Sequence, residues 1–219
     1  MTSLSSPVSR IDHACLMADS FAEKKAAMLP YIKRGLELGD ECLLITDDRR
    51  EDDWCFELQA YGIDVDAERK ADRLMIRQSH LITQGCGFNS VGMARTAWTG
   101  LQASLSAHSS LRMAVDVTAA YVPHWSPDQV CHWEATLDLL YEGLPVQVLC
   151  TYDRPACSYD EIEAALRTHS SVLSRKVIWP NRSYDARAVL AEEQFTTQHA
   201  AWPLRSRGVA WRGVDKSVE

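Results

Sequence analysis

The stretch over residues 111–153 constrains the fold of this chain most, because it holds a complete β-α-β pattern. Two short runs within it, 111–117 and 146–150, are rich in valine, leucine and methionine, which is typical of parallel strands covered on both faces. Between them, Ser126 is followed by a proline and then by Gln129, an order that marks the start of a helix. Polar residues end both runs, and open α/β sheets bind their ligands at such strand ends.

The same alternation of strand and helix runs through most of the chain. Short apolar runs at 13–17, 41–46, 73–77 and 176–179 are separated by segments with helical spacing and capping residues. This order predicts an α/β fold with three layers, a mostly parallel sheet with helices on both faces. Pro30 lies within the first helical segment and predicts a kink or a break there.

The length of 219 residues fits one domain with short extensions. We expect a flexible N-terminus over residues 1–10, because that lead-in is rich in serine. The folded domain is expected over residues 11–185. The strand and helix pattern loosens after it, so residues 186–219 are expected to form a C-terminal helical appendage or tail.

Composition excludes several classes of protein. The formal net charge of −7 argues against a general nucleic-acid surface, because phosphate binding needs clustered Lys and Arg. We find no apolar run of membrane-spanning length and no signal-peptide layout at the start, so we expect a cytoplasmic protein. Seven cysteines without a CxxC pair fit neither a disulfide framework nor a zinc ribbon.

A glycine-rich loop over residues 85–92 leads into a helical segment. A strand, a glycine loop and a helix can hold phosphate through backbone N–H groups. The loop lacks both the Gly-Lys-Ser/Thr ending of a P-loop and the GxGxxG spacing. A turn that leads into a helix is therefore the favoured interpretation, and a phosphate site is the alternative.

Several short motifs together resemble the MEDS sensory domain, which is named for methanogen and methylotroph proteins and for the dichloromethane-dehalogenase repressor. They are His13-x-Cys15 near the start, the glycine pair over 35–39, the 149–153 run, Leu166-x-Thr-His and Asn181. The resemblance covers residues 11–185. It implies a non-catalytic module that senses a small molecule, often joined to a DNA-binding or histidine-kinase region. Neither region is recognisable here, so the output is expected through a separate regulatory partner or through self-assembly.

The middle of the chain is also similar to the core of KaiC- and RecA-like ATPases, which implies a RecA/KaiC-like strand order. In that comparison Asp116 takes the place of the magnesium-linked acidic residue. The Walker A lysine and hydroxyl are missing, although hydrolysis needs them to hold the phosphates and the metal. A relative of this kind can keep the fold and a ligand cleft without hydrolysis.

Two predicted strands carry residues that can bind a ligand. His13 and Cys15 point to one face of their strand, and Cys150 and Tyr152 do the same on theirs. If the strands are neighbours, these side chains can converge on a soft metal or a reactive small molecule. The alternative is that both cysteines fill the core, and it is preferred over a metal because the pattern lacks a fourth ligand.

Acidic residues at the predicted strand ends are further candidates. Asp47, Asp116 and Asp153 each end or follow a strand, where side chains face the cleft, although turn contacts are a common role for Asp. The resemblance also points to Glu134, which can orient a ligand, pair with Arg112 or simply be exposed on its helix. The predicted ligand-binding residues are His13, Cys15, Asp47, Asp116, Trp133, Glu134, Cys150, Tyr152 and Asp153.

We therefore predict a small-molecule-sensing regulatory protein without a resident cofactor. One alternative is a nucleotide-binding, ATPase-related enzyme that uses the glycine loop and Asp116 with magnesium. Another is an oligomeric scaffold, since RecA-like folds often form rings. No serine-histidine-aspartate order or nucleophile elbow supports another enzyme class.

Overall fold

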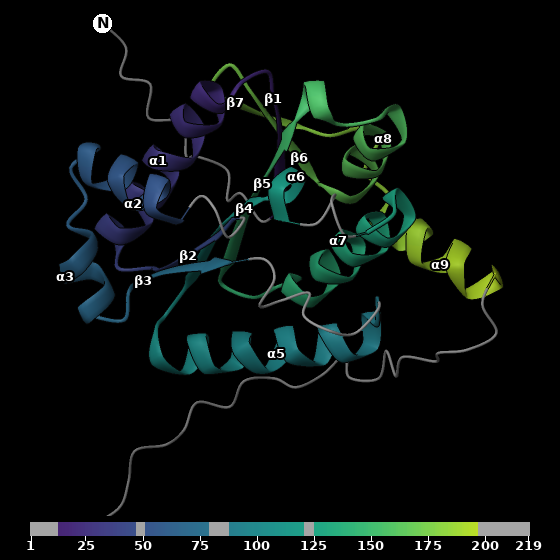
Figure 1. Ribbon diagram of the computed structural model, residues 1–219. Coiled ribbons are helices and arrows are strands. Elements are labelled where there is room, and N and C mark those ends of the chain that lie inside the picture. The colour runs from purple at the N-terminus through teal and green to yellow at the C-terminus, as the bar shows by residue number, and fades with distance from the viewer. Residues whose placement is uncertain (1–12, 47–50, 79–87, 121–124, 197–219) are drawn as a thin grey trace, which may run out of the picture.

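The computed structural model describes residues 13–46, 51–78, 88–120 and 125–196 (Figure 1). Seven strands form one sheet in the order β3-β2-β4-β5-β1-β6-β7. Every neighbouring pair is parallel apart from β6 and β7, which are antiparallel. The strands are β1 (His13–Ala18), β2 (Glu41–Thr46), β3 (Leu74–Gln78), β4 (Leu111–Asp116), β5 (Val146–Asp153), β6 (Ser171–Ser174) and β7 (Val177–Pro180).

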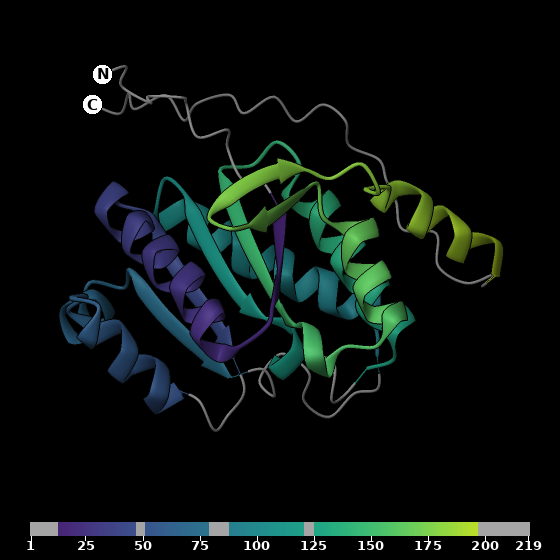
Figure 2. The same ribbon diagram turned by 90° about the horizontal axis from the view of Figure 1, so that it is seen from above.

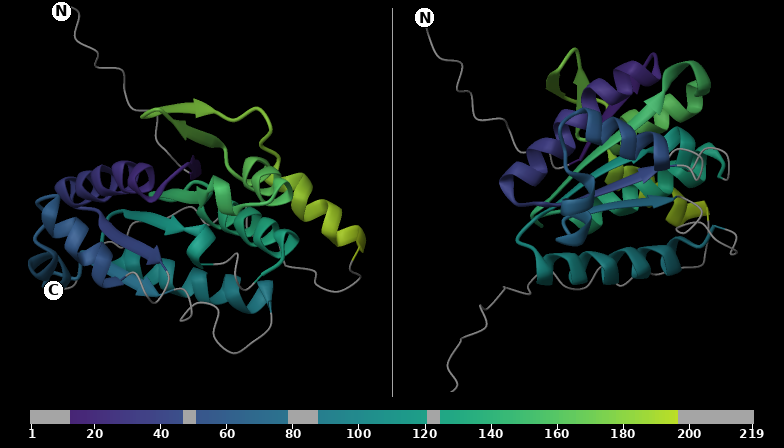
Figure 3. Two further views of the ribbon diagram at one scale, coloured as in Figure 1. Left: turned by 45° about the horizontal axis from the view of Figure 1, so that its top comes forward. Right: turned by 60° about the vertical axis from the view of Figure 1, so that its left-hand side comes forward.

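Helices cover both faces of the sheet, so the predicted three-layer α/β architecture is confirmed. Figure 3 shows α1 and α5 on opposite sides of the strands. The first face is covered by α1 (Phe21–Leu38), α2 (Glu51–Ala60) and α3 (Val65–Lys70). The second is covered by α5 (Ser90–Ala107), α7 (Pro127–Tyr141) and α8 (Tyr159–Thr168), and α9 (Ala186–Thr196) packs on α7 and α8. A short α6 (Val117–Ala120) and a 3-10 turn (Arg154–Ala156) follow β4 and β5.

The two cores arise from the alternation of side chains along the strands. On β1, Ala14 and Leu16 join the core beneath α1, whereas Cys15 joins the core beneath α7. Nearly every residue of the central strands β4 and β5 is buried on both faces. This is why both strands are continuous apolar runs in the sequence.

Capping motifs fix where the helices begin. Ser126 and Gln129 form a complete capping box at the start of α7, and Ser158 and Glu161 form another at α8. Helix α1 is continuous through Pro30, so the break that the proline suggested is not observed. Pro30 lies on the exposed side of α1.

The edge of the sheet beside β1 differs from the sequence-based prediction. There β6 and β7 form an antiparallel hairpin (Figure 2), whereas the sequence indicated one last strand near β7. The hairpin turns at Arg175 and Lys176, both at positive φ. Tight hairpin turns usually place Asn, Asp or Gly at such positions, so the usual turn signal is missing here.

Candidate functional site

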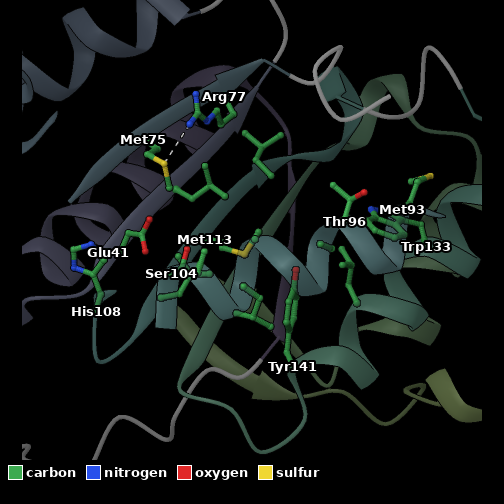
Figure 4. A pocket seen from close by; sticks show the side chains of 18 of the residues that line it. Glu41, Met75, Arg77, Met93, Thr96, Ser104, His108, Met113, Trp133 and Tyr141 are labelled. Atoms are coloured by element: carbon green, nitrogen blue, oxygen red, sulfur yellow. Dashed lines mark hydrogen bonds between the residues drawn. The ribbon is translucent and has the colours of Figure 1, made fainter. Parts of the chain in front are cut away.

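A cavity of about 830 Å³ lies between the sheet and helix α5 (Figure 4). We call it the α5 cavity. Strands β2, β3 and β4 form its floor, α5 covers it and α7 closes one side. Its walls are mainly apolar, and the methionines Met75, Met93 and Met113 contribute to them.

Most of the side chains that α5 presents to the cavity are small. A Cβ atom added at Gly100 would meet no heavy atom within 4 Å, so this part of the helix faces open space. Larger side chains at these positions would fill the gap. The small residues of α5 that line the cavity are Gly92, Thr96, Ala97, Gly100, Ala103, Ser104 and Ala107.

Two polar groups on the cavity wall are buried and have no hydrogen-bond partner among the described residues. They are Oε2 of Glu41, an acceptor, and Nε1 of Trp133, a donor. Figure 4 places these two residues at opposite ends of the cavity. Buried polar groups are normally hydrogen-bonded, and both atoms are covered by protein, so a ligand in the cavity would reach them only after neighbouring side chains shift.

A second site lies inside the protein, where α7 and the end of α8 face β1 and β5. His13 on β1, Glu134 on α7, Cys150 on β5 and His169 at the end of α8 bring one donor atom each within 4.8 Å of one another. We call these four residues the buried cluster. Each is at most 2% exposed. The pairing of β1 with β5 explains why His13 and Cys150 meet. Cys15 lies opposite Cys150, and His13, two residues before Cys15, points to the same face of the sheet.

Short distances connect the members of the buried cluster. Oε2 of Glu134 lies 3.3 Å from Nε2 of His13 and 3.5 Å from Nε2 of His169. The sulfur of Cys150 lies 3.5 Å from the same carboxylate oxygen and 3.6 Å from Nε2 of His13. On its other side, Nδ1 of His13 lies 3.1 Å from Oδ1 of Asp138.

The surroundings shift the protonation of both histidines in opposite directions. Burial alone would lower the pKa of His13, but hydrogen bonds to the Asp138 and Glu134 carboxylates outweigh it and raise the pKa to about 9. Burial and the nearby His13 cation lower the pKa of His169 to about 3. Burial and the Glu134 carboxylate raise the pKa of the Cys150 thiol well above its usual value. At neutral pH the metal-free cluster therefore holds one imidazolium, one neutral imidazole and a thiol.

A third polar site lies at the carboxyl edge of the sheet. Lys24, in the first turn of α1, places Nζ 2.7 Å from Oδ1 of Asp116 and 2.9 Å from Oδ1 of Asp153. These carboxylates end β4 and β5, as the sequence predicted. The Asp116 carboxylate, which the nucleotide-binding alternative would assign to magnesium, is thus paired with a cation of the chain itself.

Six of the nine predicted site residues belong to these three places. His13, Glu134 and Cys150 belong to the buried cluster, Tyr152 packs edge-on against His169, and Cys15 lies in the core on the same face. Trp133 lines the α5 cavity, and Asp116 and Asp153 hold Lys24. Asp47 lies outside the described residues.

Glu134 is neither exposed nor paired with Arg112, two of the roles that the sequence left open. It is 1% exposed within the buried cluster. Arg112 instead donates from Nε to Oδ2 of Asp40 at 2.8 Å.

Sequence reasoning missed the roles of His169 and Asp138. His169 enters the sequence analysis only as part of the Leu166-x-Thr-His motif, but it is fully buried at the end of α8. Asn181 donates to the carbonyl oxygens of Leu166 and His169, which closes this helix end over the core. Asp138 follows Glu134 by four residues on α7, a spacing that places both carboxylates on one helix face and could have indicated the site.

In the part of the chain that the structure describes, none of the helices combines the length and the apolar character needed to cross a membrane. The family model described as MEDS, the MEthanogen/methylotroph, DcmR Sensory domain, matches residues 12–170. No protein with a curated description matches the chain at a significant level.

Proposed function

Because this chain belongs to the MEDS family of sensory domains, we propose that it senses a small organic molecule by binding it in the α5 cavity. The observation that carries the proposal is the cavity itself, whose volume of about 830 Å³ is in the range of small-molecule sites. Its mainly apolar wall with a few polar groups is also typical of such sites.

The wall indicates what kind of molecule fits. Methionine side chains adapt to irregular apolar surfaces, and three of them line the cavity. Glu41 offers an acceptor at one end and Trp133 a donor at the other. We therefore expect an elongated, mainly apolar ligand with a donor group at the Glu41 end, and the Glu41 carboxylate disfavours an anion at that end.

The signal is proposed to leave the domain through α5. The small residues of this helix leave a gap above the sheet, so a bound molecule changes what α5 packs against. A ligand shifts a conformational equilibrium only through different contacts in its two states, and the α5 cavity provides them. We propose that the conformational change is recognised by a regulatory protein, such as a histidine kinase or a DNA-binding regulator, or by a second copy of the chain.

The test compares two neighbouring substitutions on α5. Gly100→Leu places a side chain into the cavity, and Thr99→Leu adds the same side chain at an exposed position that does not line it. The protein is first analysed by native mass spectrometry for co-purified molecules, and a panel of small organic compounds is then screened by thermal shift and calorimetry.

A compound present at 100 times its Kd stabilises the folded protein by about 2.7 kcal/mol. We expect this stabilisation in the natural sequence and in Thr99→Leu, and its loss in Gly100→Leu. Equal binding by all three proteins would place the ligand elsewhere and refute the proposed site. ATP with magnesium belongs in the same panel, and its binding and hydrolysis would favour the nucleotide-binding alternative.

A further inference from the structure

The buried cluster has the spacing of a metal site. Tetrahedral zinc, with bonds of about 2.0–2.3 Å, places neighbouring ligand atoms roughly 3.3–3.6 Å apart. Four of the six separations between the donor atoms of His13, Glu134, Cys150 and His169 are 3.3, 3.5, 3.5 and 3.6 Å. The remaining two are within 4.8 Å, so small side-chain shifts complete the tetrahedron.

The outer nitrogen of each histidine is already held by an acceptor. Nδ1 of His169 lies 2.7 Å from the carbonyl oxygen of Ala165, and Nδ1 of His13 lies 3.1 Å from the Asp138 carboxylate. Each Nδ1 must therefore carry the hydrogen and donate it. In a neutral imidazole this leaves the lone pair on Nε2, which faces the cluster. Metal-binding histidines are oriented by the same kind of contact.

Without a metal ion, part of this arrangement is unfavourable. The Nε2 lone pair of His169 lies 3.5 Å from the carboxylate oxygen Oε2 of Glu134, and this nitrogen has no hydrogen bond among the described residues. Oε1 of Glu134 is also buried without a hydrogen-bond partner among them. Two electron-rich atoms that face one another away from water are stabilised by a positive ion between them.

We propose that His13, Glu134, Cys150 and His169 bind one zinc ion. One thiolate, two imidazoles and a carboxylate form a donor set that zinc accepts, and four protein ligands make a closed site. Charge also balances, because Zn²⁺ with the Glu134 carboxylate and the Cys150 thiolate is neutral inside the core. Binding forms the Zn–S bond and releases the thiol proton, together with any proton on Nε2 of His13, to solvent.

Four different elements of the fold supply the four ligands. The donors come from β1, α7, β5 and the end of α8, which lie far apart in the sequence. A zinc ion there joins the sheet to the two helices that cover it. Asp138 extends from His13 toward the surface, where its other oxygen accepts a hydrogen bond from the hydroxyl of Tyr184.

The competing interpretation is a metal-free network in which protonated His13 bridges Asp138 and Glu134. Zinc content and cobalt spectra separate the two. The full chain is stripped of metal with a chelator, titrated with Co²⁺ and then with Zn²⁺, and its metal content is measured by mass spectrometry. Tetrahedral cobalt bound by a thiolate shows strong visible bands and a sulfur-to-cobalt charge-transfer band.

We expect one metal per chain and a charge-transfer band that zinc removes. Cys150→Ser should abolish the band, and Cys157→Ser, at a half-buried thiol outside the cluster, should keep it. Asp138→Asn should weaken zinc binding by about 10–100-fold, because it removes the carboxylate that orients His13. Circular dichroism verifies that each variant is folded.

A measurement on the natural sequence covers the case in which Cys150→Ser does not fold. X-ray absorption at the zinc edge should give one sulfur at about 2.3 Å and three nitrogen or oxygen ligands. Absence of bound metal at micromolar zinc, a band that survives in Cys150→Ser, or a site without sulfur would overturn the proposal. None of these outcomes decides whether the α5 cavity binds a ligand, so the two proposals can fail separately.

Discussion

Replacing Lys24 with methionine should destabilise the protein by roughly 3–5 kcal/mol, the usual cost of removing one partner of a buried ion pair. Lys24 is 1% exposed, and its ammonium lies 2.7 Å from Asp116 and 2.9 Å from Asp153. Methionine is unbranched and close to lysine in length, so the substitution removes the charge and keeps most of the packing. The Asp116 carboxylate then stays inside the protein without its lysine.

The two carboxylates should contribute unequally. The side chain of Asp116 is 2% exposed, whereas that of Asp153 is 36% exposed and is screened by water. Asp116→Asn should therefore cost several times as much as Asp153→Asn, for which about 1 kcal/mol or less is expected. The double variant Lys24→Met with Asp116→Asn should lose less than the sum of the single variants, because neither buried charge remains.

Urea unfolding followed by circular dichroism measures these differences from the midpoints, provided that the slopes agree. The reasoning fails if Lys24→Met costs less than about 1 kcal/mol, the range of exposed pairs. It also fails if Asp153→Asn costs as much as Asp116→Asn, because burial would then not decide the strength of the pair.

Three further predictions concern stability. In chelator-treated protein, folding raises the pKa of His13 from 6.5 to about 9, which adds about 3 kcal/mol to the free energy of unfolding. This contribution is complete below pH 6.5 and is lost as the pH rises through 9. The pKa of His169 is lowered to about 3 in the folded protein, so this residue destabilises the fold as the pH falls below 6.5. The urea midpoint should therefore be highest near pH 6.5. Asp138→Asn should reduce the fall of the midpoint above that pH, because it removes a carboxylate that raises the pKa of His13. Ser158→Ala removes the hydroxyl of the α8 capping box and should cost about 1 kcal/mol in the same assay, whereas Ser158→Thr should cost less. At Gly35, an added Cβ would meet buried side chains at 2.6 Å, so Gly35→Ala should lower stability by about 1–3 kcal/mol in urea titrations; an unchanged midpoint would mean that these side chains yield freely.

Local patterns were sufficient to predict the fold and part of the buried cluster. The apolar runs of β4 and β5 and the capping box at Ser126 mark their elements directly, because burial and capping act within a few residues. The alternation on two strands also placed His13 and Cys150 on matching faces. Whether those faces meet depends on strand order, which the sequence does not encode locally, and the structure places β1 beside β5.

The α5 cavity could not be predicted in the same way. Small residues such as Gly100 and Ser104 are common in helices, and whether they border a cavity depends on what the opposite sheet surface leaves unfilled. Lys24 shows the same limit. A lysine in the first turn of a helix is usually solvated, and only the carboxylates that end β4 and β5 explain its burial.

Helix α7 connects the α5 cavity with the buried cluster. Trp133 lines the cavity and Glu134, the next residue, belongs to the cluster; they are about 100° apart around the helix axis. A rotation or shift of α7 that accommodates a ligand beside Trp133 therefore also moves Glu134 relative to His13 and His169. Linkage then requires that the ligand change the affinity for zinc by the same factor as zinc changes the affinity for the ligand. Two calorimetric titrations, each with and without the other component, should give equal factors, and factors that both equal one would show that α7 does not couple the two sites.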